Sequence, residues 1–429
     1  MGVTTSPNPN AERPSTGLIL TGGGARAAYQ VGVLQAIAQI RRDCGVQGNP
    51  FQVIAGTSAG AINAASLATQ ADRFDHAVDA LVDLWSTIKV ADVYRSDAFD
   101  AIRTGTQWMT MMSVGWAIRR WRKTRPSSLL DNAPLGELLA RVVAFERLPQ
   151  VLAEGHLDAL AVSGSSYSSG QHVTFYQSRQ TVTPWLRSQR LAVPARLTVD
   201  HLMASSAIPF IFPAHELDVD GRREWLGDGS MRQSAPISPA IHLGAQRVLV
   251  IGAGRMQEMG KLDARVQLPG HPSMAQIAGH ALSNIFLDAL AVDVERLQRI
   301  NKTLSLLSPG AFAATPLRPV DVLVISPSRR LDDLAGLHQL ELPPAIRTLL
   351  GGVGVQGQGK AATGSALASY LLFVRGYTTE LITLGMTDTL ARRQDVLRFF
   401  GWSEAQREPV WARLRRQGFL VPEGEMASG

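Results

Sequence analysis

The sequence predicts an α/β fold with a mostly parallel central sheet, helices on both faces of the sheet and a helical C-terminal extension. Two stretches carry this prediction, residues 18–38 and 51–65, because each runs from a short apolar strand through a glycine loop into a helix. Two consecutive units of this kind require parallel strands joined by crossover helices. The chain of 429 residues is 45% hydrophobic and 18% charged, so it can bury a large core.

Further apolar runs extend the predicted sheet. Strands are expected at residues 18–20, 51–55, 157–162, 172–176, 247–252 and 321–325. A long helix is expected over residues 273–300, with Leu282, Ile285, Ala289 and Val292 toward the core. We divide the chain into a disordered tail (1–16), a main α/β domain (17–330) and a helical C-terminal extension (331–429).

The turn between the second strand and its helix has the pattern G-x-S-x-G. Gly56 and Gly60 flank Ser58, an apolar strand precedes them and an Ala-rich helix follows. A Cβ atom at either glycine would crowd a turn this sharp. The turn holds the hydroxyl of Ser58 at the end of a strand, at the positive N-terminus of the next helix. This context predicts that Ser58 is a nucleophile and that the two glycines shape a nucleophile elbow.

The glycine loop after the first strand admits two interpretations. Gly22, Gly24 and Ala27 fit G-x-G-x-x-[G/A], and Asp43 follows about 20 residues further on, as in a dinucleotide-binding fingerprint. Alternatively, the backbone N–H groups of Gly22, Gly23 and Gly24 form an oxyanion hole at a helix N-terminus. A dinucleotide site gives no reason for a nucleophile elbow on the very next strand, whereas acyl transfer needs both parts. We therefore favour the oxyanion hole.

A carboxylate between two glycines supplies a third motif. Asp228 lies between Gly227 and Gly229, so it can approach a hydroxyl without crowding and accept its proton as a general base. An isolated Asp-Gly pair normally indicates a turn. Together with the serine turn and the glycine loop, it predicts an acyl-transfer site.

These three motifs, in this order, resemble the patatin-like phospholipase family. The likeness covers roughly residues 17 to 252 and includes the segment 203–210 ahead of the aspartate. The resemblance implies a patatin-like fold for residues 17–330 and a Ser–Asp dyad acting on lipid acyl esters, without a metal or organic cofactor. It assigns Ser58 as nucleophile, Asp228 as general base, and Gly22–Gly24 with Arg26 as the oxyanion hole.

The sequence departs from the family pattern at two positions. Ala27 stands where the family usually has Gly, and Ser230 stands where it usually has Gly or Ala. Both replacements are small, so we expect the geometry of the site to survive. The histidines nearest the aspartate motif, His201, His215 and His242, form no recognisable catalytic pattern, which favours a dyad over a triad.

The predicted function is that of a serine-dependent lipid acyl hydrolase of phospholipase A, lysophospholipase or esterase type. Two alternatives stay open at this point. One is a catalytically silent lipid-binding or regulatory protein with the same fold. The other is a dinucleotide-binding oxidoreductase built on the glycine loop of residues 22–27.

Composition adds expectations about partners and location. The only cysteine is Cys44, which excludes an intramolecular disulfide and a thiolate metal cluster and favours a reducing, cytoplasmic setting. No run of about 18 apolar residues occurs, so no bilayer span is expected. The net charge of +6 favours anionic partners, and no nucleic-acid motif accompanies it. The oligomeric state is left open.

One stretch admits a membrane interpretation. Residues 108–118 are rich in Trp and Met, and five basic residues follow within 119–125. The segment 108–125 therefore reads either as a peripheral membrane contact or as a helix over the active-site cleft with a solvated basic end. We favour the second, because interfacial helices show a cleaner polar face.

Overall fold

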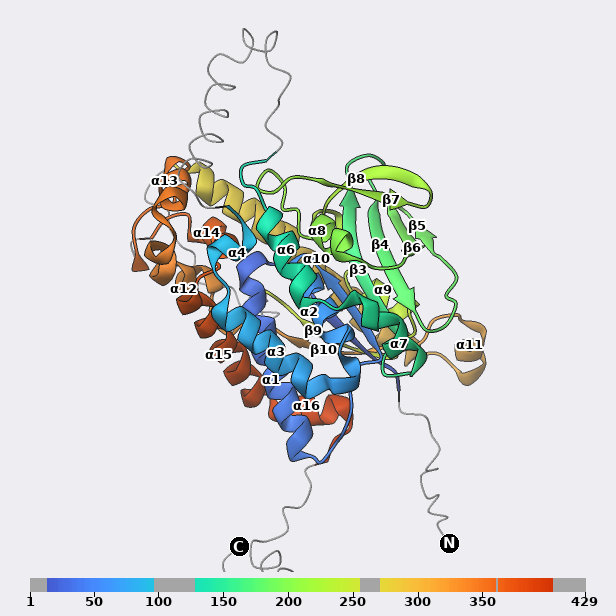
Figure 1. Cartoon of the computed structure of the whole chain (residues 1–429). Coiled ribbons are helices and arrows are strands. Elements are labelled where there is room, and N and C mark those ends of the chain that lie inside the picture. Colours follow the sequence, from blue (N-terminus) through green and yellow to red (C-terminus); the bar gives the residue numbers. More distant parts are fainter. Residues whose placement is uncertain (1–13, 96–127, 255–270, 360–361, 404–429) are drawn as a thin grey trace, which may run out of the picture.

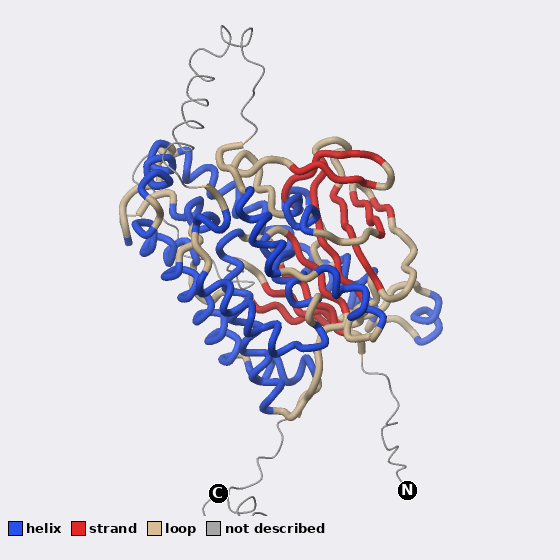
Figure 2. The backbone as a smooth tube through the Cα atoms, in the orientation of Figure 1, coloured by secondary structure: helices blue, strands red, loops and turns tan. Residues whose placement is uncertain are grey.

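The computed structural model of the chain describes residues 14–95, 128–254, 271–359 and 362–403. A ten-stranded sheet lies at the centre, with helices packed on both of its faces (Figures 1 and 2). The strands are β1 (Thr16–Leu20), β2 (Val53–Thr57), β3 (Ala159–Ser166), β4 (His172–Ser178), β5 (Leu186–Arg187), β6 (Arg190–Pro194), β7 (His215–Val219), β8 (Arg222–Asp228), β9 (Arg247–Ile251) and β10 (Asp321–Ile325). The predicted α/β class, with its mostly parallel sheet, is confirmed.

The helices include long elements and short 3-10 turns. The α-helices are α1 (Ala28–Asp43), α2 (Ala59–Ala68), α3 (Phe74–Thr87), α4 (Val90–Val93), α6 (Ala133–Val142), α7 (Leu148–Ala153), α8 (Val199–Ser205), α9 (Ser238–His242), α10 (Met274–Leu304), α11 (Pro309–Ala314), α12 (Leu331–His338), α13 (Pro344–Gly352), α14 (Ser365–Leu371), α15 (Arg375–Ala391) and α16 (Arg393–Phe400). The 3-10 helices are η1 (Gly24–Ala27), η2 (Ala71–Arg73), η3 (Phe145–Arg147), η4 (Gly229–Arg232) and η5 (Gln339–Glu341).

The strand order explains how distant motifs meet. The order is β10-β9-β1-β2-β3-β4-β6-β5, and the β7–β8 hairpin joins where β8 pairs with β3. The first five of these strands are parallel neighbours. Strand β2 pairs with residues 159–163 of β3, and β8 pairs antiparallel with residues 164–166. Because β4 occupies the other edge of β3, strand β8 continues along the edge of β3 from the point where β2 ends.

The two faces of the sheet support separate cores, as the alternation of side chains in a strand requires. In β1, Leu18 and Leu20 belong to the larger core, together with α1, α2, α3 and the C-terminal helices α14 to α16. Ile19 points to the opposite face, where α9 and α10 pack. The predicted arrangement with helices on both faces therefore follows from the burial of both sides of each parallel strand.

The C-terminal helices pack on the main domain through close backbone contact. A Cβ atom at Gly32 of α1 would lie 1.9 Å from the carbonyl oxygen of Ile382, and one at Gly385 of α15 would lie 2.2 Å from that of Tyr29. Reciprocal glycines thus let α1 and α15 approach more closely than any side chain would allow. The larger core runs across the predicted boundary at residue 330, which stays a prediction.

Helix α10 differs from expectation in which side chains it buries. Leu282 is buried as predicted, but Val292 is 54% exposed. Leu290 and Val294 are buried instead and pack in the core on the face of the sheet opposite α1. The helix is also long and apolar enough to cross a membrane by length and composition alone, although the sequence predicted no span, and one such helix is weak evidence of one.

Candidate active site

The serine turn joins β2 directly to α2. Ser58 is buried and has φ 57° and ψ −132°, a left-handed backbone conformation that is uncommon for a residue with a side chain. A Cβ atom at Gly56 would lie 2.5 Å from the Cα of Ala61, and one at Gly60 would lie 2.3 Å from the carbonyl oxygen of Leu20. Both flanking positions therefore require glycine, and the surrounding packing maintains a strained serine at the N-terminus of α2.

Strand β3 brings Asp228 close to the serine turn, because it pairs with both β2 and β8. Asp228 is the last residue of β8 and is fully buried. It pairs with Gly164 of β3, while the preceding residue of β3, Ser163, pairs with Thr57 at the end of β2. A Cβ atom at Gly229 would lie 2.3 Å from the carbonyl oxygen of Ser163. The Asp228–Gly229 turn thus packs against the end of β2, next to Ser58.

The carboxylate of Asp228 is only half satisfied. Its Oδ1 accepts a hydrogen bond from the backbone N–H of Ser230 at 2.9 Å. Its Oδ2 is buried and has no partner among the described residues. Burial raises the pKa of Asp228 to about 6, although the nearby Ser58 hydroxyl and the Ser230 backbone and hydroxyl groups work in the opposite direction. The structure therefore presents a basic carboxylate, with one open oxygen, to the serine hydroxyl.

The glycine loop between β1 and α1 is held at both ends by amide side chains. Gln30 Nε2 donates to the carbonyl oxygen of Thr21 at 2.7 Å, and Asn63 Nδ2 donates to that of Ala27 at 3.2 Å. The two amides are joined at 3.0 Å, and Trp85 Nε1 donates to Asn63 Oδ1 at 2.7 Å. This buried network connects the loop to α2 and α3. No local sequence pattern predicts this network, because its amide side chains meet only in the folded chain.

The glycine loop and the serine turn border the same cavity. No hydrogen bond between described residues uses the N–H groups of Gly22, Gly23 or Gly24. Gly24 has φ 55° and lines the same cavity as Ser58. Free N–H groups at the start of a helix, beside a hydroxyl, can receive an anionic oxygen.

Arg26, which the family resemblance assigns to the oxyanion hole, makes its side-chain contacts with the C-terminal region. Its guanidinium pairs with Asp332 at 2.5 Å and donates to Ser369 Oγ at 2.7 Å and to the carbonyl oxygen of Ala366 at 3.2 Å. It also lies 4.0 Å from the ring centroid of Tyr370. Because these partners belong to α12 and α14, Arg26 connects the glycine loop to the C-terminal region, rather than serving as a free positive charge beside Ser58.

The histidines named from the sequence have other neighbours. His201 contacts Thr198 at 3.0 Å, His215 lies 3.2 Å from Asp200, and His242 stacks on Trp185. The sequence analysis did not single out His172, which is buried at the start of β4. Burial lowers the pKa of His172 to about 4, against the effect of its hydrogen bond to the backbone of Gly229. It is therefore a neutral neighbour of the aspartate turn.

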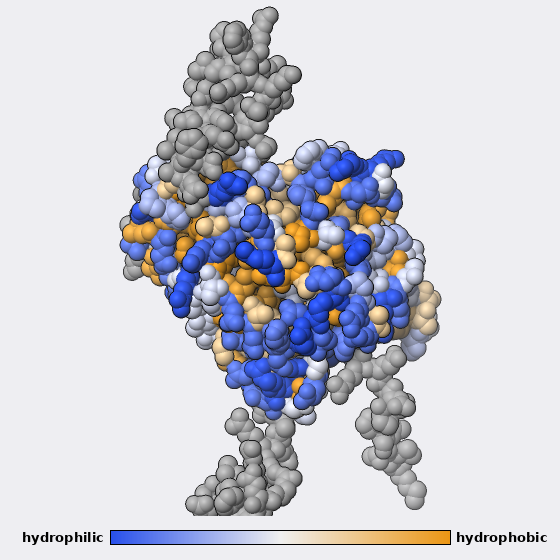
Figure 3. All heavy atoms as spheres, viewed as in Figure 1, coloured by the Kyte–Doolittle hydropathy of each residue, from blue (hydrophilic) through white to orange (hydrophobic). Residues whose placement is uncertain are grey.

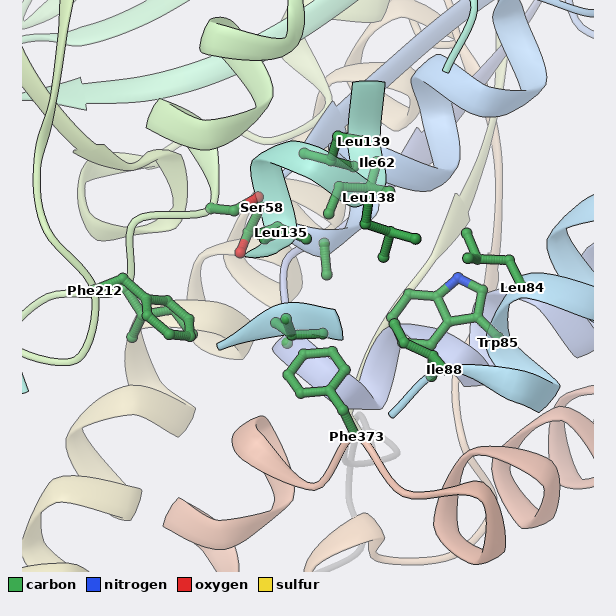
Figure 4. Close-up of a pocket in the computed structure, with 15 residues that line it drawn as sticks. Ser58, Ile62, Leu84, Trp85, Ile88, Leu135, Leu138, Leu139, Phe212 and Phe373 are labelled. Carbon is green, nitrogen blue, oxygen red and sulfur yellow. The ribbon is translucent and has the colours of Figure 1, made fainter. Parts of the chain in front are cut away.

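A narrow apolar cavity begins at Ser58 (Figure 4). Its walls come from α2, α3, α6 and residues 206–212, with Phe373 added from the C-terminal region. The free volume is about 30 Å³, so the cavity is small. Figure 3 shows a mainly hydrophilic face with an apolar area in the region of α6. An apolar cavity with a hydroxyl at one end suits a hydrocarbon chain attached to a polar reacting group.

Metal ligands are not gathered at this site. Among the described residues, no group of three or more His, Cys, Asp and Glu side chains is arranged to hold a metal ion. Residues 108–125, which the sequence offers as a membrane contact or a cleft-covering helix, lie outside the described residues.

Fold and site together define an α/β protein with a strained serine, a buried carboxylate and a glycine loop at one edge of a parallel sheet. The chain belongs to the patatin-like phospholipase family, whose model matches residues 18–241, more than half of its length. This confirms the resemblance noted in the sequence, and membership supports hydrolysis of lipids. No curated protein matches the chain.

Several solved structures are similar to the chain. VipD from Legionella pneumophila is 12% identical, with 86% of this chain and 67% of that one covered and a TM-score of 0.31. Human GIVD cytosolic phospholipase A2 is 11% identical, with 91% and 63% covered and a TM-score of 0.37. Full-length ExoU from Pseudomonas aeruginosa, in complex with SpcU, is 20% identical, with 38% and 34% covered and a TM-score of 0.19. The chain thus spans between a third and two thirds of their lengths, and TM-scores below 0.5 support no conclusion about its function.

Proposed function

We propose that this protein is a serine-dependent lipid acyl hydrolase, of phospholipase A, lysophospholipase or esterase type, with Ser58 and Asp228 as its catalytic dyad. One observation carries the proposal. A fully buried carboxylate keeps one oxygen without a partner among the described residues, beside a serine in a strained backbone conformation. Buried polar groups are normally satisfied, and strain normally relaxes, so the two together mark a site kept for chemistry.

The dyad accounts for both half-reactions. Ser58 Oγ attacks the ester carbonyl carbon while its proton passes to Asp228 Oδ2, and the tetrahedral intermediate collapses as the alcohol leaves with that proton. Water then attacks the acyl-enzyme, Asp228 takes a proton from it, and the second intermediate releases the fatty acid and regenerates the Ser58 hydroxyl. With a pKa of about 6, Asp228 is ionised at neutral pH and is a stronger base than an exposed aspartate.

The glycine loop is the proposed oxyanion hole. The N–H groups of Gly22, Gly23 and Gly24 stabilise the negative oxygen of each tetrahedral intermediate, and loss of one such donor typically costs about 10² to 10³ in rate. Arg26 serves the hole indirectly, since its contacts with α12 and α14 hold the loop in place.

The dinucleotide alternative fits the structure less well. A Cβ atom at Gly24 would lie 2.2 Å from the carbonyl oxygen of Tyr370, so the loop is covered where a pyrophosphate would have to approach. Asp43, the residue in place of the ribose-binding acid, pairs with Arg393 at 3.0 Å. A melting-temperature increase with NAD(P) would be required to revive this function.

The test is hydrolysis of a medium-chain p-nitrophenyl ester by wild type, Ser58→Ala and Asp228→Asn. Each variant has a matched control in the same chain. Ser66→Ala removes a buried hydroxyl from α2, the helix that follows Ser58. Asp293→Asn changes a buried aspartate of α10, which packs on the other face of the sheet. We expect activity to disappear in the site variants and persist in the controls, with circular dichroism verifying folding. Full activity in Ser58→Ala would refute the proposal.

Active-site labelling distinguishes a hydrolase from a lipid-binding protein that has no catalytic activity. A serine-directed fluorophosphonate should label the wild type and Ser66→Ala but not Ser58→Ala. Absence of labelling in folded wild type, together with retained lipid binding, would favour the silent protein. The cytoplasmic location and the membrane contact through residues 108–125 stay predictions.

A further inference from the structure

The C-terminal region contributes to the cavity that begins at Ser58. Phe373 is buried in the three-residue link between α14 and α15, far beyond the residues matched by the family model. It lines the cavity together with Ser58. In Figure 4 its ring lies between Phe212 and Trp85, and Ser58 lies on the Phe212 side. The wall of the cavity therefore comes from two distant parts of the chain.

Aromatic contacts fix the position of this ring. Phe373 stacks on Trp85 with ring centroids 6.2 Å apart, and it meets the edge of Tyr94 at 6.3 Å. The Tyr94 hydroxyl donates to the carbonyl oxygen of Leu371 at 2.8 Å. Trp85 is itself held by Asn63, which also supports the glycine loop. The ring of Phe373 is thus positioned by the residues that organise the reacting end of the site.

The link that carries Phe373 is also anchored to the glycine loop. The carbonyl of Tyr370 lies against Gly24, and Arg26 bonds to Ser369 and Asp332. These contacts allow little displacement of α14 relative to Ser58. A wall that is both close to the nucleophile and firmly held limits what the cavity accepts.

The small free volume of the cavity restricts the acyl chains that can enter it. Because the cavity is small and lined by packed side chains, an acyl chain enters only as these side chains move, and each further methylene requires more displacement. Helices α2, α3 and α6 carry their lining residues within the packed core. Phe373 lies on a link rather than within a helix, and it lines the cavity beside Trp85, on which its ring stacks.

We infer that Phe373 is a specificity-determining residue that limits the length of the acyl chain the site accepts, with Trp85 as the next wall behind it. This inference rests on the proposed hydrolase function. It assigns a role in substrate selection to a C-terminal region whose role the sequence left open. Substitution by a smaller residue should extend the cavity toward Trp85 and favour longer acyl chains.

The test compares Phe373→Ala with Phe400→Ala as matched control. Phe400 is equally buried in the C-terminal region but packs on Phe51 and Trp402, away from the cavity. For p-nitrophenyl dodecanoate against hexanoate, we expect the ratio of kcat/KM values to rise about tenfold in Phe373→Ala, since one or two methylenes in an apolar pocket change selectivity by this order. The ratio should stay at the wild-type value in Phe400→Ala.

A binding measurement separates this inference from the hydrolase proposal. In a Ser58→Ala background, the increase in melting temperature with dodecanoate relative to hexanoate reports chain-length selection without catalysis. The added Phe373→Ala substitution should enlarge that difference, and Phe373→Leu replaces it if the alanine variant does not fold. Unchanged selectivity in both assays, or an equal shift in Phe400→Ala, would overturn the role of Phe373. Altered binding selectivity without any hydrolysis would retain it and reject the hydrolase.

Discussion

Two buried charged side chains, Asp228 and Arg26, lie near the candidate site and differ in how completely their polar atoms are hydrogen-bonded. Arg26 is saturated, with a carboxylate, a hydroxyl, a carbonyl and an aromatic ring around its guanidinium. Asp228 is fully buried as well, yet one of its oxygens has no partner among the described residues. Burying a charge without partners is costly, so a saturated charge indicates structural anchoring and an unsaturated one indicates a group kept available for reaction.

The same contrast separates two regions of the molecule. The strands around Ser58 hold a strained turn and a basic carboxylate, whereas α12 and α14 hold the loop beside them through satisfied contacts. Stability and activity should therefore respond to different substitutions. The four predictions below test this separation.

Asp228→Asn should have the largest effect. Loss of the general base is expected to lower kcat by about 10² to 10⁴, while the melting temperature stays equal or rises, because an unpaired buried charge is removed. Steady-state hydrolysis and thermal unfolding measure the two effects, with Asp293→Asn as control. A strongly destabilised Asp228→Asn would contradict the distinction between the two charges.

Arg26→Leu should show the reverse pattern. It removes a buried guanidinium and its hydrogen bonds, while Asp332 is partly exposed and keeps a contact with Arg330 at 3.8 Å, so the expected loss of unfolding free energy is about 3 kcal/mol. Arg393→Leu breaks the half-exposed pair with Asp43 and should cost about 1 kcal/mol or less. Denaturant unfolding measures both. If folded Arg26→Leu lost as much activity as Asp228→Asn, Arg26 would have a direct role in the reaction and not only in anchoring the loop.

Gly24→Ala tests whether the glycine loop takes part in the reaction or only in packing. The new Cβ would meet the Tyr370 carbonyl at 2.2 Å in a left-handed conformation, displacing the N–H donors of the loop. Hydrolysis should fall by about 10² to 10³. Gly45→Ala shares the left-handed backbone but has nothing within 4 Å, so it should cost about 1 kcal/mol of stability and leave kcat unchanged. Equal kcat values in the two variants would remove the loop from the mechanism.

The pH profile provides the smallest and most specific signal. Because Asp228 must be ionised to accept a proton, kcat should fall about tenfold per pH unit below a midpoint near pH 6. The free energy of unfolding changes with pH in the opposite direction to kcat. The folded pKa is raised above the ordinary 3.8, so the protonated folded state is favoured, and stability falls as pH rises from about 4 to about 6.

The size of that stability change follows from the same shift. A difference between 3.8 and about 6 corresponds to an upper value of about 3 kcal/mol, which Asp228→Asn should abolish. Unfolding at pH 4 and pH 7, compared between wild type and the variant, measures it. An acid limb near pH 4 would contradict a raised pKa.

Most of the fold was predictable because its signals are local. The apolar runs near residues 18–20, 247–252 and 321–325 became β1, β9 and β10, since buried parallel strands need no polar alternation. The error at Val292 arose where a long helix offers two apolar stripes and only the partner surface selects one.

The sequence alone determined the candidate residues of the site, because the motifs around Ser58 and Asp228 are local patterns of glycines that shape sharp turns. Tertiary structure decided the rest. Only the pairing of β2 and β8 with β3 brings Ser58 and Asp228 together, 170 residues apart in the chain. Only the packing of α14 on the glycine loop gives Arg26 its partners and places Phe373 in the cavity, because long-range contacts depend on shapes that no local pattern encodes.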